Sequence, residues 1–125
     1  MTCPILIVDD DEDVRDLLSL QLKRRGFEVD AVDSAYSCLE RLAGMSTCVI
    51  ITDVEMPGMS GLELCATVRD RHPGIIAIVM SGATTPSLAA RAMDSGAFRF
   101  LAKAASSSAL YATLLSAMAT VAATT

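Results

Sequence analysis

The chain has 125 residues, of which 52% are hydrophobic and 20% are charged, and its formal net charge is −5. This length matches one ordinary domain, and the hydrophobic fraction excludes an intrinsically disordered chain. The acidic balance argues against binding to nucleic acid or to an anionic membrane surface. No apolar run approaches the roughly 18 residues of a membrane helix, and the N-terminus lacks a basic signal-peptide start. We therefore expect a cytoplasmic protein with one domain over residues 1–125.

The cysteines and the single histidine carry no metal or redox motif. The four cysteines lie inside apolar runs, without Cys-x-x-Cys spacing, at Cys3, Cys38, Cys48 and Cys65. We expect buried thiols in a reducing compartment. His72 precedes Pro73 at the expected end of a helix, where a structural or solvent role is expected.

Short apolar runs alternate with longer stretches of helical spacing along the chain. In chain order they predict a strand at 5–8, a helix at 12–25, a strand at 27–32, a helix at 34–44, a strand at 48–51, a helix at 60–72, a strand at 75–80, a helix at 86–95, a strand at 98–101 and a last helix from 106. The first helix carries one apolar stripe, formed by Val14, Leu17, Leu18 and Leu22. The helix ends carry the expected caps, with Ser34, Ser60 and Thr85 at the starts and Gly26, Gly44 and Gly96 at the ends.

Five strands alternating with five helices predict an α/β fold, a doubly wound parallel sheet covered by helices on both faces. Ligands of such sheets bind beyond the carboxyl ends of the strands. Four of the predicted strands are followed there by reactive side chains: Asp9, Asp10 and Asp11, then Asp53, then Ser81, then Lys103. Clustered carboxylates need a counterion, and Mg²⁺ favours a few carboxylates with waters and a phosphoryl oxygen. The sequence therefore predicts a magnesium site balanced by a lysine.

With these residues at its strand ends, the sequence resembles the receiver domain of two-component response regulators over essentially its whole length. The matching segments are Ile7–Asp11 (IVDDD), Thr52–Gly61 (TDVEMPGMSG), Val79–Ala83 (VMSGA) and Phe100–Lys103 (FLAK). One such motif is weak evidence, whereas four in order, each at the end of its predicted strand, are strong evidence. The resemblance implies a flavodoxin-like (βα)5 fold with the strand order 2-1-3-4-5.

The resemblance also implies roles for individual residues. Asp53 would accept a phosphoryl group from a phosphohistidine of a sensor histidine kinase or a histidine phosphotransfer protein. Asp10 and Asp53 would bind Mg²⁺ directly, Asp9 would act largely through a water, and the backbone carbonyl of Glu55 would complete the protein ligands. Lys103 would bind one phosphoryl oxygen.

Ser81 and Phe100 are the implied switch residues. The hydroxyl of Ser81 would move to the phosphoryl group, and Phe100 would turn inward into the space left behind. This would change the face built by the helix at 86–95, the strand at 98–101 and the last helix. We expect that face to contact a downstream effector, a fused output domain or a second copy, since no charged side chain occurs between Ala104 and Thr125.

Three positions depart from the usual family pattern. Ala104 follows Lys103 where the family usually has a proline and a cis peptide, so the loop is either a strained cis form, at about 2.5–4 kcal/mol, or trans. Phe100 lacks the hydroxyl of the tyrosine often found there. The acidic side chain of Glu55, beside the acceptor, either repels an attacking hydroxide or reaches the metal.

Two other classes of protein share part of this pattern. A haloacid-dehalogenase-like phosphatase would use Asp9 as its nucleophile within Asp9-x-Asp11-x-Asp13, but no acidic residue follows Asp94. A flavodoxin-like electron carrier would need a phosphate loop after the first strand, where three acids stand instead. No ATP-binding glycine loop occurs, so the phosphoryl group must come from outside. We thus expect a signalling module that catalyses its own phosphorylation and turns over no external substrate.

Overall fold

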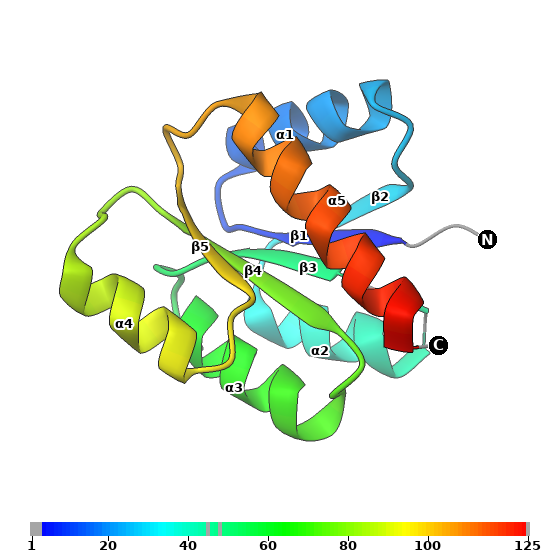
Figure 1. The fold of residues 1–125 in the computed structure, drawn as a ribbon. Coiled ribbons are helices and arrows are strands. Elements are labelled where there is room, and N and C mark those ends of the chain that lie inside the picture. Colours follow the sequence, from blue (N-terminus) through cyan, green and yellow to red (C-terminus); the bar gives the residue numbers. More distant parts are fainter. Residues whose placement is uncertain (1–3, 45, 48, 125) are drawn as a thin grey trace.

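The computed structural model describes residues 4–44, 46–47 and 49–124. The strands are β1 (Ile5–Val8), β2 (Val29–Val32), β3 (Val49–Asp53), β4 (Ile76–Ser81) and β5 (Arg99–Ala102). The helices are α1 (Glu12–Arg24), α2 (Ala35–Gly44), α3 (Gly61–Arg71), α4 (Pro86–Asp94) and α5 (Ser107–Thr124). The strands form one parallel sheet in the order β2-β1-β3-β4-β5, which confirms the predicted fold class and topology (Figure 1).

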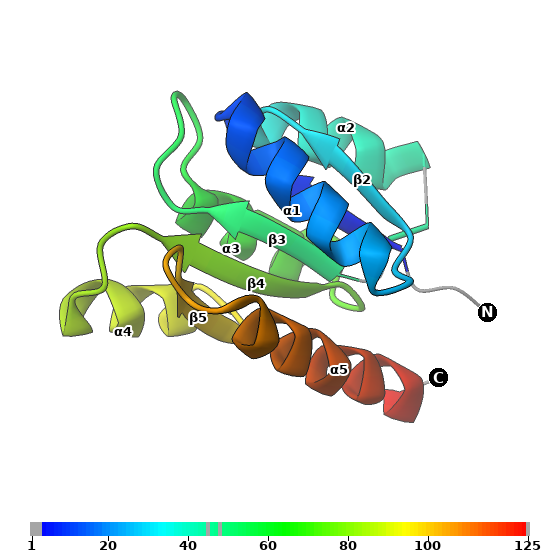
Figure 2. The same ribbon diagram turned by 90° about the horizontal axis from the view of Figure 1, so that it is seen from above.

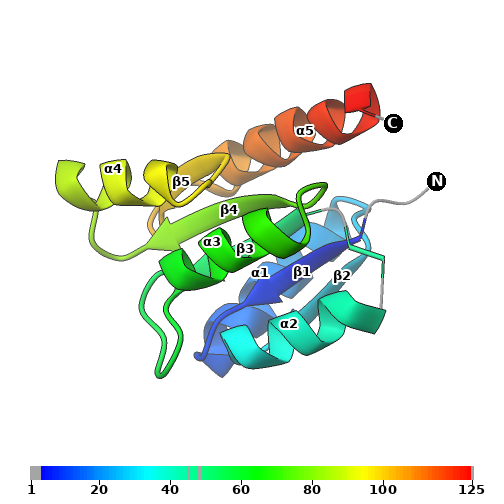
Figure 3. The same cartoon turned by 90° about the horizontal axis from the view of Figure 1, so that it is seen from below.

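The sheet divides the apolar core into two layers. Helices α1 and α5 cover one face, as the view in Figure 2 shows, and α2 and α3 cover the opposite face, with α4 beside β5 (Figure 3). Residues of β1 alternate between the layers, since Ile5 and Ile7 pack toward α5 whereas Leu6 and Val8 pack toward α2 and α3. Burial on both faces explains why the inner strands are continuous apolar runs.

The second strand begins later than its alternating pattern predicts. Gly26 adopts a φ of 89°, and the N–H of Phe27 donates to the carbonyl of Leu22, which closes the C-terminus of α1. This turn holds Phe27 outside the sheet, where its ring packs edge-on against Tyr111 of α5 at a centroid distance of 5.8 Å. Pairing with β1 therefore starts at Val29 rather than at residue 27.

One member of the predicted apolar stripe on α1 is exposed to solvent. Leu22 is buried and Leu18 packs against the core, but the side chain of Leu17 is 56% exposed. Leu17 lines the cavity that opens between α1 and α5, with Leu110 of α5 lining the same cavity, so this leucine borders open space rather than packed core.

The predicted burial of the thiols is confirmed for Cys38 and Cys65, whereas Cys3 and Cys48 lie outside the described residues. Desolvation by the surrounding core raises the pKa of Cys38 to about 12, so this thiol stays protonated at neutral pH. His72 is the C-cap residue of α3, as its place before Pro73 predicted.

Candidate functional site

The end of β1 brings two acidic side chains to the carboxyl edge of the sheet. Asp9 is only 3% exposed, while Asp10 is exposed. One carboxylate oxygen of Asp9 accepts the backbone N–H of Asp11 at 2.9 Å, and Asp11 in turn caps the N-terminus of α1. The guanidinium of Arg15 donates to the backbone carbonyl of Asp9 at 2.8 Å. These bonds fix the turn that carries both acids.

The third acid comes from the end of the neighbouring strand. Asp53 is the last residue of β3 and is 7% exposed. Carboxylate oxygens of Asp9, Asp10 and Asp53 all lie within 4.8 Å of one another. Three hard oxygen donors converging at this distance fit a divalent cation of the Mg²⁺ type. The residues that the sequence predicted as direct metal ligands are therefore brought together.

Lys103 links two of these acids. Its Nζ lies 3.2 Å from Oδ2 of Asp9 and 3.3 Å from Oδ2 of Asp53, and the side chain is 31% exposed. The backbone N–H of Lys103 donates to the carbonyl of Ser81 at 2.8 Å, which ties the end of β5 to the end of β4. The described backbone contains no cis peptide, so the bond between Lys103 and Ala104 is trans.

Burial and charge oppose each other in setting the protonation of this cluster. Desolvation raises the pKa of Asp53, and the nearby charge of Asp9 raises it further, while Lys103 acts in the opposite direction. For Lys103, desolvation alone would lower the pKa, but hydrogen bonds and charges from Asp9 and Asp53 outweigh it and raise the pKa. The lysine is therefore held in its charged form between two carboxylates.

The remaining predicted residues border the cluster in different ways. Ser81 is buried at the end of β4, and its Oγ accepts the N–H of Ala83 at 3.0 Å, so the hydroxyl is engaged in the turn before α4. The side chain of Glu55 is exposed. Phe100 is half-buried and packs against the core layer on the α2 and α3 side.

The sequence predicted no role for three residues that contact the backbone of the acids, namely Arg15, Thr52 and Gly61. Arg15 supports Asp9 as described. The hydroxyl of Thr52 donates to the carbonyl of Asp53, and a Cβ on Gly61 would lie 1.9 Å from that same oxygen. The signals available in the sequence were a threonine within an apolar strand and a glycine directly after a cap serine.

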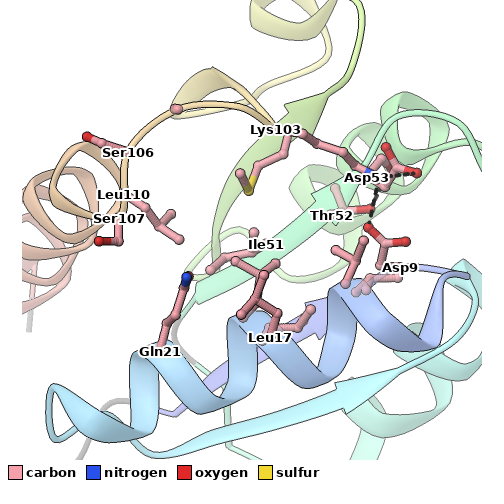
Figure 4. A pocket seen from close by; sticks show the side chains of 16 residues that line it. Asp9, Leu17, Gln21, Ile51, Thr52, Asp53, Lys103, Ser106, Ser107 and Leu110 are labelled. Atoms are coloured by element: carbon pink, nitrogen blue, oxygen red, sulfur yellow. Dashed lines mark hydrogen bonds and ion pairs between the residues drawn. The ribbon is translucent and has the colours of Figure 1, made fainter.

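A cavity of about 170 Å³ opens between α1 and α5 and reaches the acids (Figure 4). Asp9, Asp53 and Lys103 lie at one end, and Leu17, Gln21 and Leu110 line the space between the helices. The cavity therefore connects the acids with the space between the two helices.

Comparison with known proteins decides the family. A family model described as "Response regulator receiver domain" matches residues 5–115. The chain belongs to the response regulator receiver domain family. This membership excludes both the phosphatase and the electron-carrier alternatives, because neither belongs to that family. It also establishes the chain as a signalling domain of two-component systems.

Curated relatives of this receiver domain are named as response regulators or transcriptional regulatory proteins. The response regulator protein FleR of Pseudomonas aeruginosa is 38% identical over 103 residues, which is 82% of this chain and 22% of FleR. The transcriptional regulatory protein FixJ of Azorhizobium caulinodans is 39% identical over 100 residues, which is 80% of this chain and 47% of FixJ. The receiver domain thus spans from about a fifth to about half of the length of these curated relatives.

Solved structures agree with this membership. The crystal structure of FixJ-N has a TM-score of 0.86 and 32% identity, covering 94% of each chain. The solution structure of the beryllofluoride-activated NtrC4 receiver domain dimer has a TM-score of 0.89 and 26% identity, covering 94% of this chain and 98% of that one. None of the helices in the described part of our receiver domain has the length and hydropathy of a membrane span.

Proposed function

We propose that this receiver domain accepts a phosphoryl group on Asp53 from a phosphohistidine of a sensor histidine kinase or a histidine phosphotransfer protein. An oxygen of the Asp53 carboxylate forms a bond to phosphorus while the phosphorus–nitrogen bond of the donor breaks. The electron pair of the broken bond remains on the imidazole nitrogen. The observation that carries the proposal is the buried carboxylate of Asp53 beside two further carboxylates and the ammonium of Lys103.

The residues of the cluster would have separate roles in positioning and in charge balance. Asp9, Asp10 and Asp53, with the backbone carbonyl of Glu55, would hold Mg²⁺, which supplies positive charge opposite the phosphoryl oxygens. Lys103 already lies 3.3 Å from the acceptor carboxylate and would bind a phosphoryl oxygen after transfer. Its fixed position supports transfer, since a preorganised charge needs little rearrangement during the reaction.

The same site would control the face formed by α4, β5 and α5. For Ser81 to reach a phosphoryl oxygen, its hydroxyl would release the N–H of Ala83, which belongs to the turn that leads into α4. Phe100, already half-buried, would then turn inward. The changed face would contact a downstream effector, a fused output domain or a second copy. The dimer described for the NtrC4 receiver domain supports the last of these.

The test is phosphorylation by a small donor. The purified protein is incubated with acetyl phosphate and Mg²⁺, and its intact mass is measured. We expect the mass to increase by one phosphoryl group, with no increase when EDTA replaces Mg²⁺ or when Asp53→Asn replaces the wild type. Asp70→Asn is the matched control, since Asp70 is an exposed acid on α3, and it should be modified like the wild type. Undiminished modification of Asp53→Asn would contradict the proposal.

A further inference from the structure

Thr52 is a polar residue in a row of the sheet that is otherwise apolar. The paired residues across all five strands at this level are Val32, Val8, Thr52, Val79 and Phe100. Thr52 is 0% exposed and lies directly between two valines. Valine has nearly the same shape, favours strands and would avoid burying a hydroxyl. Packing alone therefore does not account for a threonine here.

The hydroxyl of Thr52 has a specific partner at the acceptor residue. Its Oγ1 donates to the backbone carbonyl of Asp53 at 3.0 Å. Gly61 stands over the same carbonyl, because a Cβ at Gly61 would lie 1.9 Å from its oxygen. At the other side of this peptide group, the N–H of Val54 donates to the carbonyl of Met80 at 3.1 Å. The peptide that follows Asp53 is thus held from three directions.

We propose that Thr52 is a positioning residue that fixes the backbone of Asp53 for phosphoryl transfer, an inference that rests on the proposed function. The orientation of this peptide sets the direction in which the Asp53 side chain leaves the strand. In-line transfer depends steeply on the placement of the attacking oxygen, since small misplacements lower the rate strongly. Thr52 acts through the backbone and touches none of the reacting atoms.

Two substitutions at Thr52 separate this role from packing. Thr52→Val keeps the shape and removes the hydroxyl, whereas Thr52→Ser keeps the hydroxyl and removes a methyl group. Thr113→Val is the matched control, because Thr113 is also buried and donates its hydroxyl to a backbone carbonyl, that of Ala109 at 2.9 Å. The initial rate of phosphorylation by acetyl phosphate is measured at saturating Mg²⁺, and the dissociation constant of Mg²⁺ by calorimetry.

We expect Thr52→Val to lower the phosphorylation rate roughly tenfold while the Mg²⁺ dissociation constant stays within about twofold of the wild type. Thr52→Ser and Thr113→Val should keep nearly the full rate. If Thr52 affects the phosphorylation rate only through packing, Thr52→Ser will be phosphorylated more slowly than Thr52→Val. This order of rates overturns the inference. A wild-type rate for Thr52→Val overturns it as well.

A second measurement does not depend on phosphorylation. Hydrogen exchange at the amide of Val54, followed by NMR, should be faster in Thr52→Val than in the wild type and unchanged in Thr52→Ser. Equal exchange in all three overturns the inference. An unphosphorylated wild type would contradict the proposed function instead, and the exchange result would still stand. If Thr52→Val does not fold, Thr52→Ala replaces it, with the same expected losses.

Discussion

Lys103 is the residue on which the charge balance of the site depends. It is the cation that lies within ion-pair distance of both Asp9 and Asp53, at 3.2 and 3.3 Å. Burial favours the neutral form of Asp53, and the lysine offsets only part of this effect, so the pKa of Asp53 remains raised. A bound divalent cation would therefore stabilise the ionised form of the acceptor carboxylate.

The raised pKa of Asp53 predicts how Asp53→Asn changes stability with pH. The folded state binds the proton of Asp53 more tightly than the unfolded chain does, so ionisation destabilises the fold as the pH rises above the unfolded value of 3.8. This loss is complete once the pH exceeds the folded pKa. Asparagine carries no charge. Without divalent cations at pH 7, we therefore expect Asp53→Asn to be more stable than the wild type by about 1 kcal/mol, which raises the melting temperature by a few degrees.

Thermal unfolding in EDTA between pH 3 and pH 8 measures this effect. The advantage of Asp53→Asn should shrink toward acidic pH, where the wild-type carboxyl is protonated. Asp16→Asn, at an exposed position on α1, serves as the control and should change little. A lower melting temperature for Asp53→Asn at pH 7 would mean that the carboxylate stabilises the fold.

Removing the lysine should have the opposite effect on stability. Lys103→Ala leaves the buried carboxylates of Asp9 and Asp53 without their cation, and we expect a loss of about 1–2 kcal/mol in EDTA. This is below the 3–5 kcal/mol typical of a broken buried pair, because Lys103 is 31% exposed. Urea unfolding with and without Mg²⁺ tests it, and Mg²⁺ should stabilise the variant at least as much as the wild type.

Lys23→Ala provides the control for this prediction, since Lys23 is exposed on α1. The Lys103→Ala variant should also bind Mg²⁺ yet fail to show the phosphorylation-dependent change in α4, β5 and α5. Equal stability of Lys103→Ala and wild type in EDTA would show that the two ion pairs contribute nothing.

At the scale of single elements, the start of α3 is set against the end of β3. The N–H of Gly61 donates to the carbonyl of Val54, and the space where a side chain of residue 61 would lie is occupied by the carbonyl of Asp53. Gly61→Ala would place a Cβ 1.9 Å from that oxygen, so α3 must shift. We expect a loss of about 2–3 kcal/mol in urea unfolding.

Gly44→Ala is the matched control for this change. An added Cβ at Gly44 meets nothing within 4 Å, and this glycine lies at the end of α2. It should be neutral or slightly stabilising. If Gly61→Ala is as stable as the wild type, the close approach of α3 to β3 is not a constraint.

The sequence predicted the elements well where local chemistry decides their ends. Ser60 and Thr85 cap α3 and α4 as expected, because a cap needs only its own neighbouring N–H groups. Phe27 was predicted wrongly as a strand residue because the turn at Gly26 includes its N–H, and its ring packs on Tyr111, far along the chain. Leu17 belongs to the predicted apolar stripe but is exposed, because it borders the cavity between α1 and α5, which depends on how the two helices pack.

At the scale of the whole molecule, the topology explains why the acids were predictable. In a parallel sheet the strand ends converge, so Asp9, Asp53 and Lys103 meet once the strand order is known. The role of Thr52 was not predictable in the same way. Its hydroxyl lies in an apolar row, and which carbonyl it meets depends on the exact course of the backbone at the end of β3.

The proposed contact face predicts a change in association. Helix α5 carries no charged side chain, and its outward positions include the exposed Ala112 and Ala119. If a second copy binds there, sedimentation velocity should show a dimer fraction that increases with concentration and with acetyl phosphate plus Mg²⁺. Ala112→Glu should reduce that fraction without changing phosphorylation. A monomer at all concentrations in both states would contradict self-association.

The central claim is that one buried aspartate, surrounded by two other acids and a lysine, takes the phosphoryl group. Reduction with borohydride converts a phosphorylated aspartate to homoserine, and peptide mass spectrometry then reports its position. After incubation with acetyl phosphate and Mg²⁺, we predict homoserine at residue 53 alone. Homoserine at residue 9 or 10, or at none of the acids, would contradict the account.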